Sequence, residues 1–104
     1  MTPADRPPAP SELEAVEREI GRIRDRMDEL DARLVGLLNE RAGCAQEIGR
    51  LKETVGLEVY QPQREREVLE HVRSESAGPL DGDAITRLFE RIIDEARRLE
   101  RSSG

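Results

Sequence analysis

Apolar residues recur at intervals of three and four along the first half of the chain. The first positions of this stripe are Leu13, Val16, Ile20, Ile23, Met27, Leu30, Leu34 and Leu37, and the spacing resumes at Cys44, Ile48, Leu51 and Val55. This period is that of one face of an α-helix, and no proline interrupts it. The pattern predicts a helix that runs to about Glu53 and is roughly 60 Å long at about 1.5 Å per residue.

Polar and helix-breaking residues mark the two ends of this long helix. Ser11 stands just before Leu13 and three residues before Glu14, which is the spacing of a capping box. Ser11 is therefore predicted to be the N-cap. Gly56 is predicted to stop the helix and to begin a short extended connection.

Two shorter helices follow. Gln61 and Pro62 open the second, which is predicted to end near Glu75. After a break at AGPLDGD, Asp81 is the predicted N-cap of a third helix that spans residues 83–101. Its predicted inner face holds Ile85, Leu88, Phe89, Ile92, Ile93, Ala96 and Leu99.

The composition agrees with an all-α fold of three helices per chain, one of them very long. The chain has 104 residues, of which 38% are charged and 2% are aromatic, and no segment alternates as a strand would. We expect a disordered tail at 1–10, which holds four prolines, a single helical domain at 11–101 and a C-terminal tail at 102–104.

A long helix with an apolar stripe needs a partner to cover it, and so short a chain offers little. A homodimer is therefore predicted, with Gly36 and Gly43 at places where another backbone comes close. The net charge of -6 argues against nucleic acid as a partner. No segment has the length and apolarity of a membrane span or of a signal-peptide core, so a cytoplasmic protein is expected. Cys44, the one cysteine, is predicted to be a buried, reduced thiol.

The long helix carries positive charge where its apolar stripe predicts a buried residue. Arg41 occupies such a position, and Lys52 lies eleven residues later, which returns to within about 20° of the same direction. Arg24 points about 100° away from Arg41 on the same helix. If Arg24 serves the same site as Arg41, a second copy of the helix supplies it more easily than the same copy does.

The two shorter helices also direct charges inward. Arg64 and Glu65 lie on the apolar side of the second helix, and Glu100 continues the inner line of the third. A single Arg in such a stripe is usually a register device or a side chain that reaches out to solvent. Three inward cations on two helices require an anion, because unpaired buried charge is costly. Acidic side chains or a small ligand with more than one carboxylate would supply it.

Four segments of the chain resemble the all-helical class of chorismate mutases. They are IRDRMDELDARLVGLLNER, EIGRLK, QREREVL and ITRLFERIIDEARRLE, and the resemblance covers about residues 13–99. It implies an intertwined homodimer of three helices per chain. It also implies isomerisation of chorismate, a small dicarboxylate, to prephenate by an intramolecular [3,3] rearrangement in aromatic amino acid (Phe/Tyr) biosynthesis, with no cofactor and no metal.

The resemblance also implies roles for particular residues. Arg24 of one subunit and Arg41 of the other would each bind a substrate carboxylate, and Arg64 would complete the cationic lining. Lys52 and Glu100 would donate to the ether oxygen, which becomes negative as the C–O bond breaks. Glu65 would accept a hydrogen bond from the ring hydroxyl.

Two positions depart from the pattern of this family. Gln61 stands where Asp is common, and Ala96 stands where a Ser can contact a carboxylate. The inward cations alone do not separate a mutase from two enzymes of the same fold, an isochorismate-pyruvate lyase and a 4-amino-4-deoxychorismate mutase. An alternative of a different functional class is a non-catalytic helical dimerisation module. In such a module the inward charges would only fix the register in which the helices pair.

Overall fold

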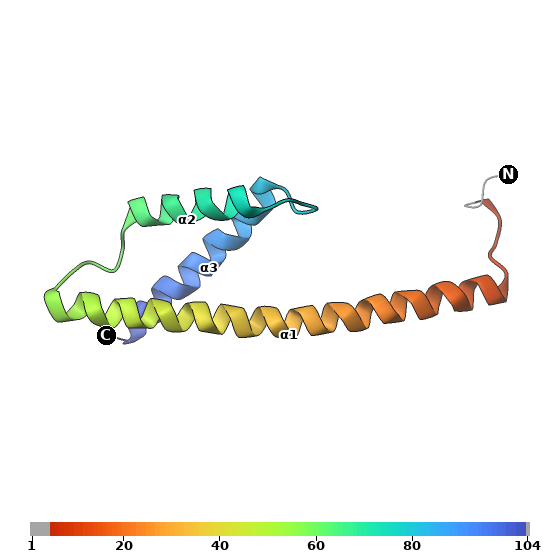
Figure 1. The fold of residues 1–104 in the computed structure, drawn as a ribbon, viewed down its shortest axis with the longest axis horizontal. Coiled ribbons are helices and arrows are strands. Elements are labelled where there is room, and N and C mark those ends of the chain that lie inside the picture. The colour runs from red at the N-terminus through yellow and green to blue at the C-terminus, as the bar shows by residue number, and fades with distance from the viewer. Residues whose placement is uncertain (1–4, 104) are drawn as a thin grey trace. The chain divides into compact units, whose positions relative to one another are not determined.

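The computed structural model describes residues 5–103 and consists of three helices (Figure 1). Helix α1 spans Pro10–Val55, α2 spans Pro62–Glu75 and α3 spans Gly82–Ser103. No strand occurs within the described residues, so the all-α prediction is confirmed. The chain divides into two units between Leu37 and Leu38, inside α1, and each unit is described by itself.

Helix α1 begins earlier than the sequence pattern predicts. The backbone N–H of Leu13 donates to the carbonyl of Ala9 at 2.9 Å, and the N–H of Ala9 donates to Oε2 of Glu12 at 3.4 Å. The predicted N-cap at Ser11 is therefore wrong, because Ser11 already lies inside the helix. Pro10 takes the first helical position, where a proline needs no donor and its fixed φ suits the helix. Residues 1–4 of the predicted tail lie outside the described part of the chain.

The end of α1 confirms the predicted stop at Gly56. Gly56 has a φ of 71°, in the left-handed region that glycine adopts without strain. Its N–H donates to the carbonyl of Glu53 at 3.3 Å, and the N–H of Leu57 donates to that of Lys52 at 2.8 Å. This pair of bonds is a Schellman motif, which fixes the direction in which the chain leaves α1.

The start of α3 also follows the prediction. Oδ1 of Asp81 accepts a hydrogen bond of 2.8 Å from the N–H of Ala84, so Asp81 caps the helix. The Arg73 guanidinium of α2 reaches Asp83 at 2.8 Å and the Thr86 hydroxyl at 3.3 Å, which ties α2 to α3. At its other end α3 continues to Ser103, two residues beyond the predicted end at 101.

In the unit that begins at Leu38, α3 returns to the C-terminal part of α1 and meets it at Gly49 (Figure 1). A Cβ atom at position 49 would lie 3.3 Å from Cγ of Glu100, so the absence of a side chain permits this approach. Gly36 and Gly43, which were expected to face another backbone, have no such neighbour within 4 Å in the described chain. Within this unit, the close approach of α3 to α1 is therefore at Gly49.

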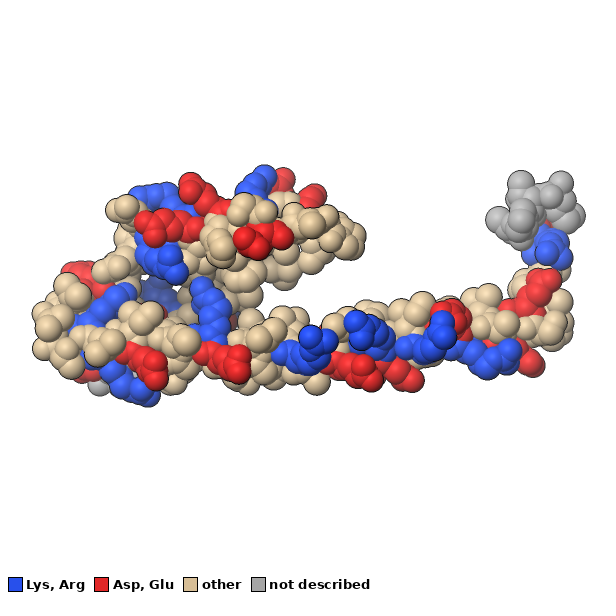
Figure 2. All heavy atoms as spheres, in the orientation of Figure 1, with Lys and Arg blue, Asp and Glu red and all other residues tan. Residues whose placement is uncertain are grey.

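Few side chains are buried in a single copy of the chain. Ala45 and Gly49 are the buried residues among those described. The apolar stripe of residues 13–37 remains 40% to 61% exposed, and Figure 2 shows basic and acidic side chains along the same stretch of α1. Cys44 is exposed, so its predicted burial is wrong for the single chain. Leu88 is 53% exposed, in contrast to its predicted place on the inner face of α3.

No helix in the described part of the chain has the length and apolarity needed to cross a membrane.

Candidate functional site

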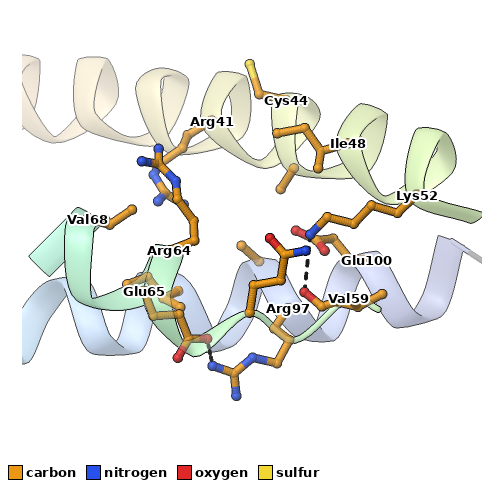
Figure 3. A pocket seen from close by; sticks show the side chains of 14 residues that line it. Arg41, Cys44, Ile48, Lys52, Val59, Arg64, Glu65, Val68, Arg97 and Glu100 are labelled. Atoms are coloured by element: carbon orange, nitrogen blue, oxygen red, sulfur yellow. Dashed lines mark hydrogen bonds and ion pairs between the residues drawn. The ribbon is translucent and has the colours of Figure 1, made fainter. Parts of the chain in front are cut away.

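One pocket of the unit that begins at Leu38 collects charged side chains from all three helices (Figure 3). Its volume is about 250 Å³, and its walls come from the C-terminal part of α1, the connection after it, α2 and α3. The charged residues that line it are Arg41, Lys52, Arg64, Glu65, Arg97 and Glu100. The remaining wall is largely aliphatic, and includes Ile48, Val68 and Ile93.

Helix α1 contributes Arg41 and Lys52, which line the pocket together with Ile48 between them. Their common direction follows from the helical period, because eleven residues are close to three full turns. The Lys52 ammonium donates a hydrogen bond of 3.3 Å to the carbonyl of Val59. An ammonium has three N–H donors, so two others remain for a ligand. Arg41 is half-buried and forms no ion pair or side-chain hydrogen bond with any residue of the described chain.

The first turn of α2 contributes Arg64 and Glu65, and Gln61 lines the pocket from the residue that precedes this helix. The Arg64 guanidinium lies 3.6 Å from the carboxylate of Glu67, and its side chain is 70% exposed. Figure 3 shows Arg41 of α1 and Arg64 of α2 extending toward the same side of the pocket. The Gln61 side chain does not cap α2, so its amide is not used by the helix end.

Helix α3 contributes Ala96, Arg97 and Glu100. The three residues fall within a little more than one helical turn, so they present neighbouring parts of one face to the pocket. Arg97 forms an ion pair with Glu65 of α2, and Glu100 is half-buried where α3 approaches Gly49. The contact with Gly49 brings the Glu100 side chain into the same space as Lys52, as Figure 3 shows.

The charges of the pocket do not balance. Four cationic side chains face two carboxylates, which leaves a formal excess of two positive charges in a partly enclosed space. Coulomb attraction is stronger in such a space than in open water, so the pocket favours a small anion with two negative charges. No group of three or more His, Cys, Asp or Glu side chains among the described residues is placed to hold a metal ion.

The structure brings together most of the residues that the sequence singled out. Arg41, Lys52, Gln61, Arg64, Glu65, Ala96 and Glu100 all line this pocket. Arg24 belongs to the other unit, where its side chain is exposed. The functional roles of all eight residues stay predictions.

Sequence reasoning missed Arg97 as a member of the site. It lines the pocket, its side chain is 24% exposed, and its guanidinium lies 4.7 Å from the centre of the Tyr60 ring. One signal was present, because Arg97 lies four residues after Ile93 and therefore on the inward face of α3. That spacing does not identify Glu65 of α2 as the ion-pair partner of Arg97.

Proteins of known function are similar to this chain in sequence. The chain is 40% identical to the bifunctional chorismate mutase/prephenate dehydratase of Stutzerimonas stutzeri and 41% identical to that of Pseudomonas aeruginosa, over 83 residues in each case. Both matches cover 75% of this chain and 23% of the relative, so the chain spans about a quarter of the length of these proteins.

Solved structures are similar in fold. A chorismate mutase from Thermus thermophilus superimposes with a TM-score of 0.78 at 36% identity, over 80% of this chain and 94% of that one. The chorismate mutase of Helicobacter pylori in complex with prephenate shares the fold, with a TM-score of 0.77 at 24% identity over 83% of this chain and 93% of that one. The model of the family described as chorismate mutase type II matches residues 23–101, and the chain belongs to that family.

Proposed function

We propose that this chain isomerises chorismate to prephenate by an intramolecular [3,3] rearrangement. The observation that carries the proposal is the excess of positive charge in a small pocket lined by three helices. Chorismate has two carboxylates, so its charge is opposite to that of the pocket. Membership of the type II family and the names of the similar proteins support the same reaction.

The reaction requires that a flexible substrate be held in a compact, chair-like conformation. Fixed contacts at both carboxylates would restrict its internal rotation and so supply part of the rate enhancement. Arg41 has no partner within the described chain and would bind one carboxylate, while Arg64 would add positive charge from α2. Arg24, supplied by a second copy, would bind the other carboxylate.

The second requirement is stabilisation of the charge that grows on the ether oxygen as the C–O bond breaks. Lys52 would donate to this oxygen, since its bond to Val59 holds the ammonium at the pocket and leaves donors unused. Glu100 would be the second donor, and for this its carboxyl group must carry a proton. No nucleophile or general base is needed, because one bond breaks and one forms within the same molecule.

The remaining site residues would adjust recognition of the substrate. Glu65 would accept from the ring hydroxyl, and Gln61 would offer a neutral amide at the edge of the pocket. Ala96 leaves a methyl group where a hydroxyl would add a polar contact. A small apolar surface at this point would affect affinity more than the chemical step, because Lys52 and Glu100 are the proposed donors to the ether oxygen.

The proposed enzyme is a homodimer with shared active sites, intertwined through α1. Support comes from the apolar stripe of residues 13–37, which stays exposed in one copy. A second, mostly apolar hollow of about 420 Å³ lies between α1 and α3, with Leu38, Ile92 and Leu99 in its wall, and would receive part of the partner. Residues 11–101 would form the catalytic domain, and the cytoplasm would be its location.

The test is an assay of the purified chain with chorismate, isochorismate and 4-amino-4-deoxychorismate in parallel. We expect chorismate to disappear as prephenate forms, without added metal or cofactor. Release of pyruvate from isochorismate without chorismate turnover would identify the lyase instead, and turnover of the amino compound alone would identify the other mutase. A stable dimer that converts none of the three would be a dimerisation module.

A role in phenylalanine and tyrosine biosynthesis would follow from this activity. It is supported by the relatives named bifunctional chorismate mutase/prephenate dehydratases.

A further inference from the structure

Arg64 pairs with Glu67, which does not line the pocket. Arg97 differs from the other three cations of the pocket because its partner is a carboxylate of the pocket itself. It forms an ion pair with Glu65, and the side chains of both residues are only about one-quarter exposed. Its guanidinium also stacks over the Tyr60 ring at 4.7 Å from the ring centre. Asp94, one turn earlier on α3, is a weaker partner at 3.8 Å.

These contacts join three segments that form the pocket. Arg97 lies on α3, Glu65 on α2 and Tyr60 on the connection between α1 and α2. A planar guanidinium can pair with a carboxylate along its edge and stack on an aromatic ring with its face, which a lysine cannot do. Figure 3 shows Glu65 turned toward Arg97, on the side of the pocket away from Arg41 and Lys52.

The electrostatic consequence concerns Glu65 and the incoming dianion. A carboxylate in a site for a dianion repels the substrate unless a cation neutralises it. Without Arg97, the half-buried Glu65 would also compete for the nearest remaining cations of the lining. Either effect would reduce the positive charge available to the substrate.

We propose that Arg97 is a positioning residue that engages Glu65 and thereby leaves Arg41, Lys52 and Arg64 for the substrate dianion. Arg97 acts through Glu65, fixing the direction of its carboxylate and offsetting its charge. This inference rests on the proposed function, because it takes a dicarboxylate as the occupant of the pocket.

The first variants change Arg97 itself. Arg97→Leu keeps an apolar stem of similar bulk, and should lower kcat/KM for chorismate by roughly 10- to 100-fold, mainly through KM. Arg97→Lys keeps the charge but loses the planar contacts to Glu65 and Tyr60, so its loss should be intermediate. Arg98→Leu is the matched control at the next residue, which is exposed and does not line the pocket. It should leave both kinetic constants unchanged.

The decisive variant removes the charge that Arg97 offsets. Glu65→Gln alone should lower activity, because a hydroxyl acceptor is changed. In Glu65→Gln enzyme, adding Arg97→Leu should cost only about twofold more, since no carboxylate remains to be positioned. If the loss of kcat/KM in the double variant equalled the product of the two single losses, the inference would be overturned. Wild-type values of kcat and KM in Arg97→Leu would also overturn it.

Folding and the proposed reaction are controlled separately. Helical circular dichroism and thermal midpoints of all variants identify losses that come from unfolding. If the wild-type chain does not convert chorismate, the proposed mutase activity is wrong. Calorimetric titration with chorismate then tests Arg97 directly, with weaker binding expected for Arg97→Leu and rescue expected in the double variant. Absence of chorismate binding by the wild-type chain would overturn both proposals.

Discussion

At the scale of single residues, Arg41 explains why the apolar stripe of α1 is interrupted. The residue faces a pocket rather than a packed core, and no residue of the described chain neutralises it. A fully packed seam would impose a large desolvation cost on this guanidinium. An open pocket keeps that cost low until an anion binds and supplies the opposite charge.

Lys52 offers the first test at this scale. Lys52→Ala removes the proposed donor to the ether oxygen, and loss of one such preorganised donor typically costs about 10²–10³ in kcat. The fold should persist, because the lysine makes only a long hydrogen bond of 3.3 Å to Val59. Turnover is measured beside circular dichroism and molecular mass. Near-normal turnover would remove Lys52 from the chemistry, whereas altered assembly would favour a register role.

Glu100 offers a second test, through pH. A carboxyl group donates a hydrogen bond only when protonated, so activity should be highest on the acidic side and fall as pH rises. Glu100→Gln supplies a permanent donor of similar shape, so it should hold activity to higher pH and flatten the profile. An unchanged profile would exclude Glu100 from the donor role.

At the scale of elements, the approach of α3 to α1 sets the position of Glu100. Gly49 provides the space, and Glu100 is the neighbour that a new side chain would meet. The Schellman motif at Gly56 and the cap at Asp81 fix where α1 ends and α3 begins. These local signals give the helices their lengths, while the glycine allows two of them to approach closely.

Gly49→Ala tests this arrangement. The added Cβ at 3.3 Å from Cγ should displace Glu100 by a few tenths of an ångström and lower kcat several-fold. Stability should change by less than about 1 kcal/mol, because alanine improves helix propensity by a similar amount. Both quantities are read from kinetics and thermal unfolding.

Asp81→Ala is the contrasting variant for that experiment. It removes the bond to Ala84 and should cost about 1 kcal/mol of stability while leaving kcat of the folded enzyme unchanged. If Gly49→Ala behaved in the same way, the close approach would be structural only.

At the scale of the whole molecule, one copy of the chain leaves much apolar surface in water. The stripe of residues 13–37 is at least 40% exposed along its length, and two small residues are the buried ones among those described. Burial of such a stripe against a second copy would contribute roughly 25 cal/mol per Å² of apolar area. The homodimer proposed above would therefore be needed for a stable fold as well as for a complete site.

A mixing experiment tests the shared site. Arg24→Ala and Arg41→Ala should each be almost inactive, since each lacks one carboxylate contact. After subunit exchange, a heterodimer has one site with both arginines intact, so an equal mixture should regain about a quarter of wild-type activity. Mass spectrometry or tagged subunits would verify exchange. Heterodimers that form and remain inactive would contradict a site built from two subunits.

The helices, and the face on which Arg41 and Lys52 lie, were determined by the sequence alone. Their signals are local, because the apolar period, Gly56 and Asp81 act within a few residues of themselves. The start of α1 was misjudged because Ser11 and Pro10 both suit a helix beginning, and the proline took the first position. The preference of serine for the N-cap competed with the preference of proline for the first helical position, and the apolar spacing does not show which of the two prevails.

Only the tertiary structure decided which residues of different helices meet. Glu65 and Arg97 are separated by most of α2 and α3, and Gly49 and Glu100 lie on different helices. Periodicity fixes the face of a helix, but the level at which two helices cross depends on how their side chains pack. For this reason the inward charges could be predicted from the sequence, whereas the pairing of Glu65 with Arg97 required the fold.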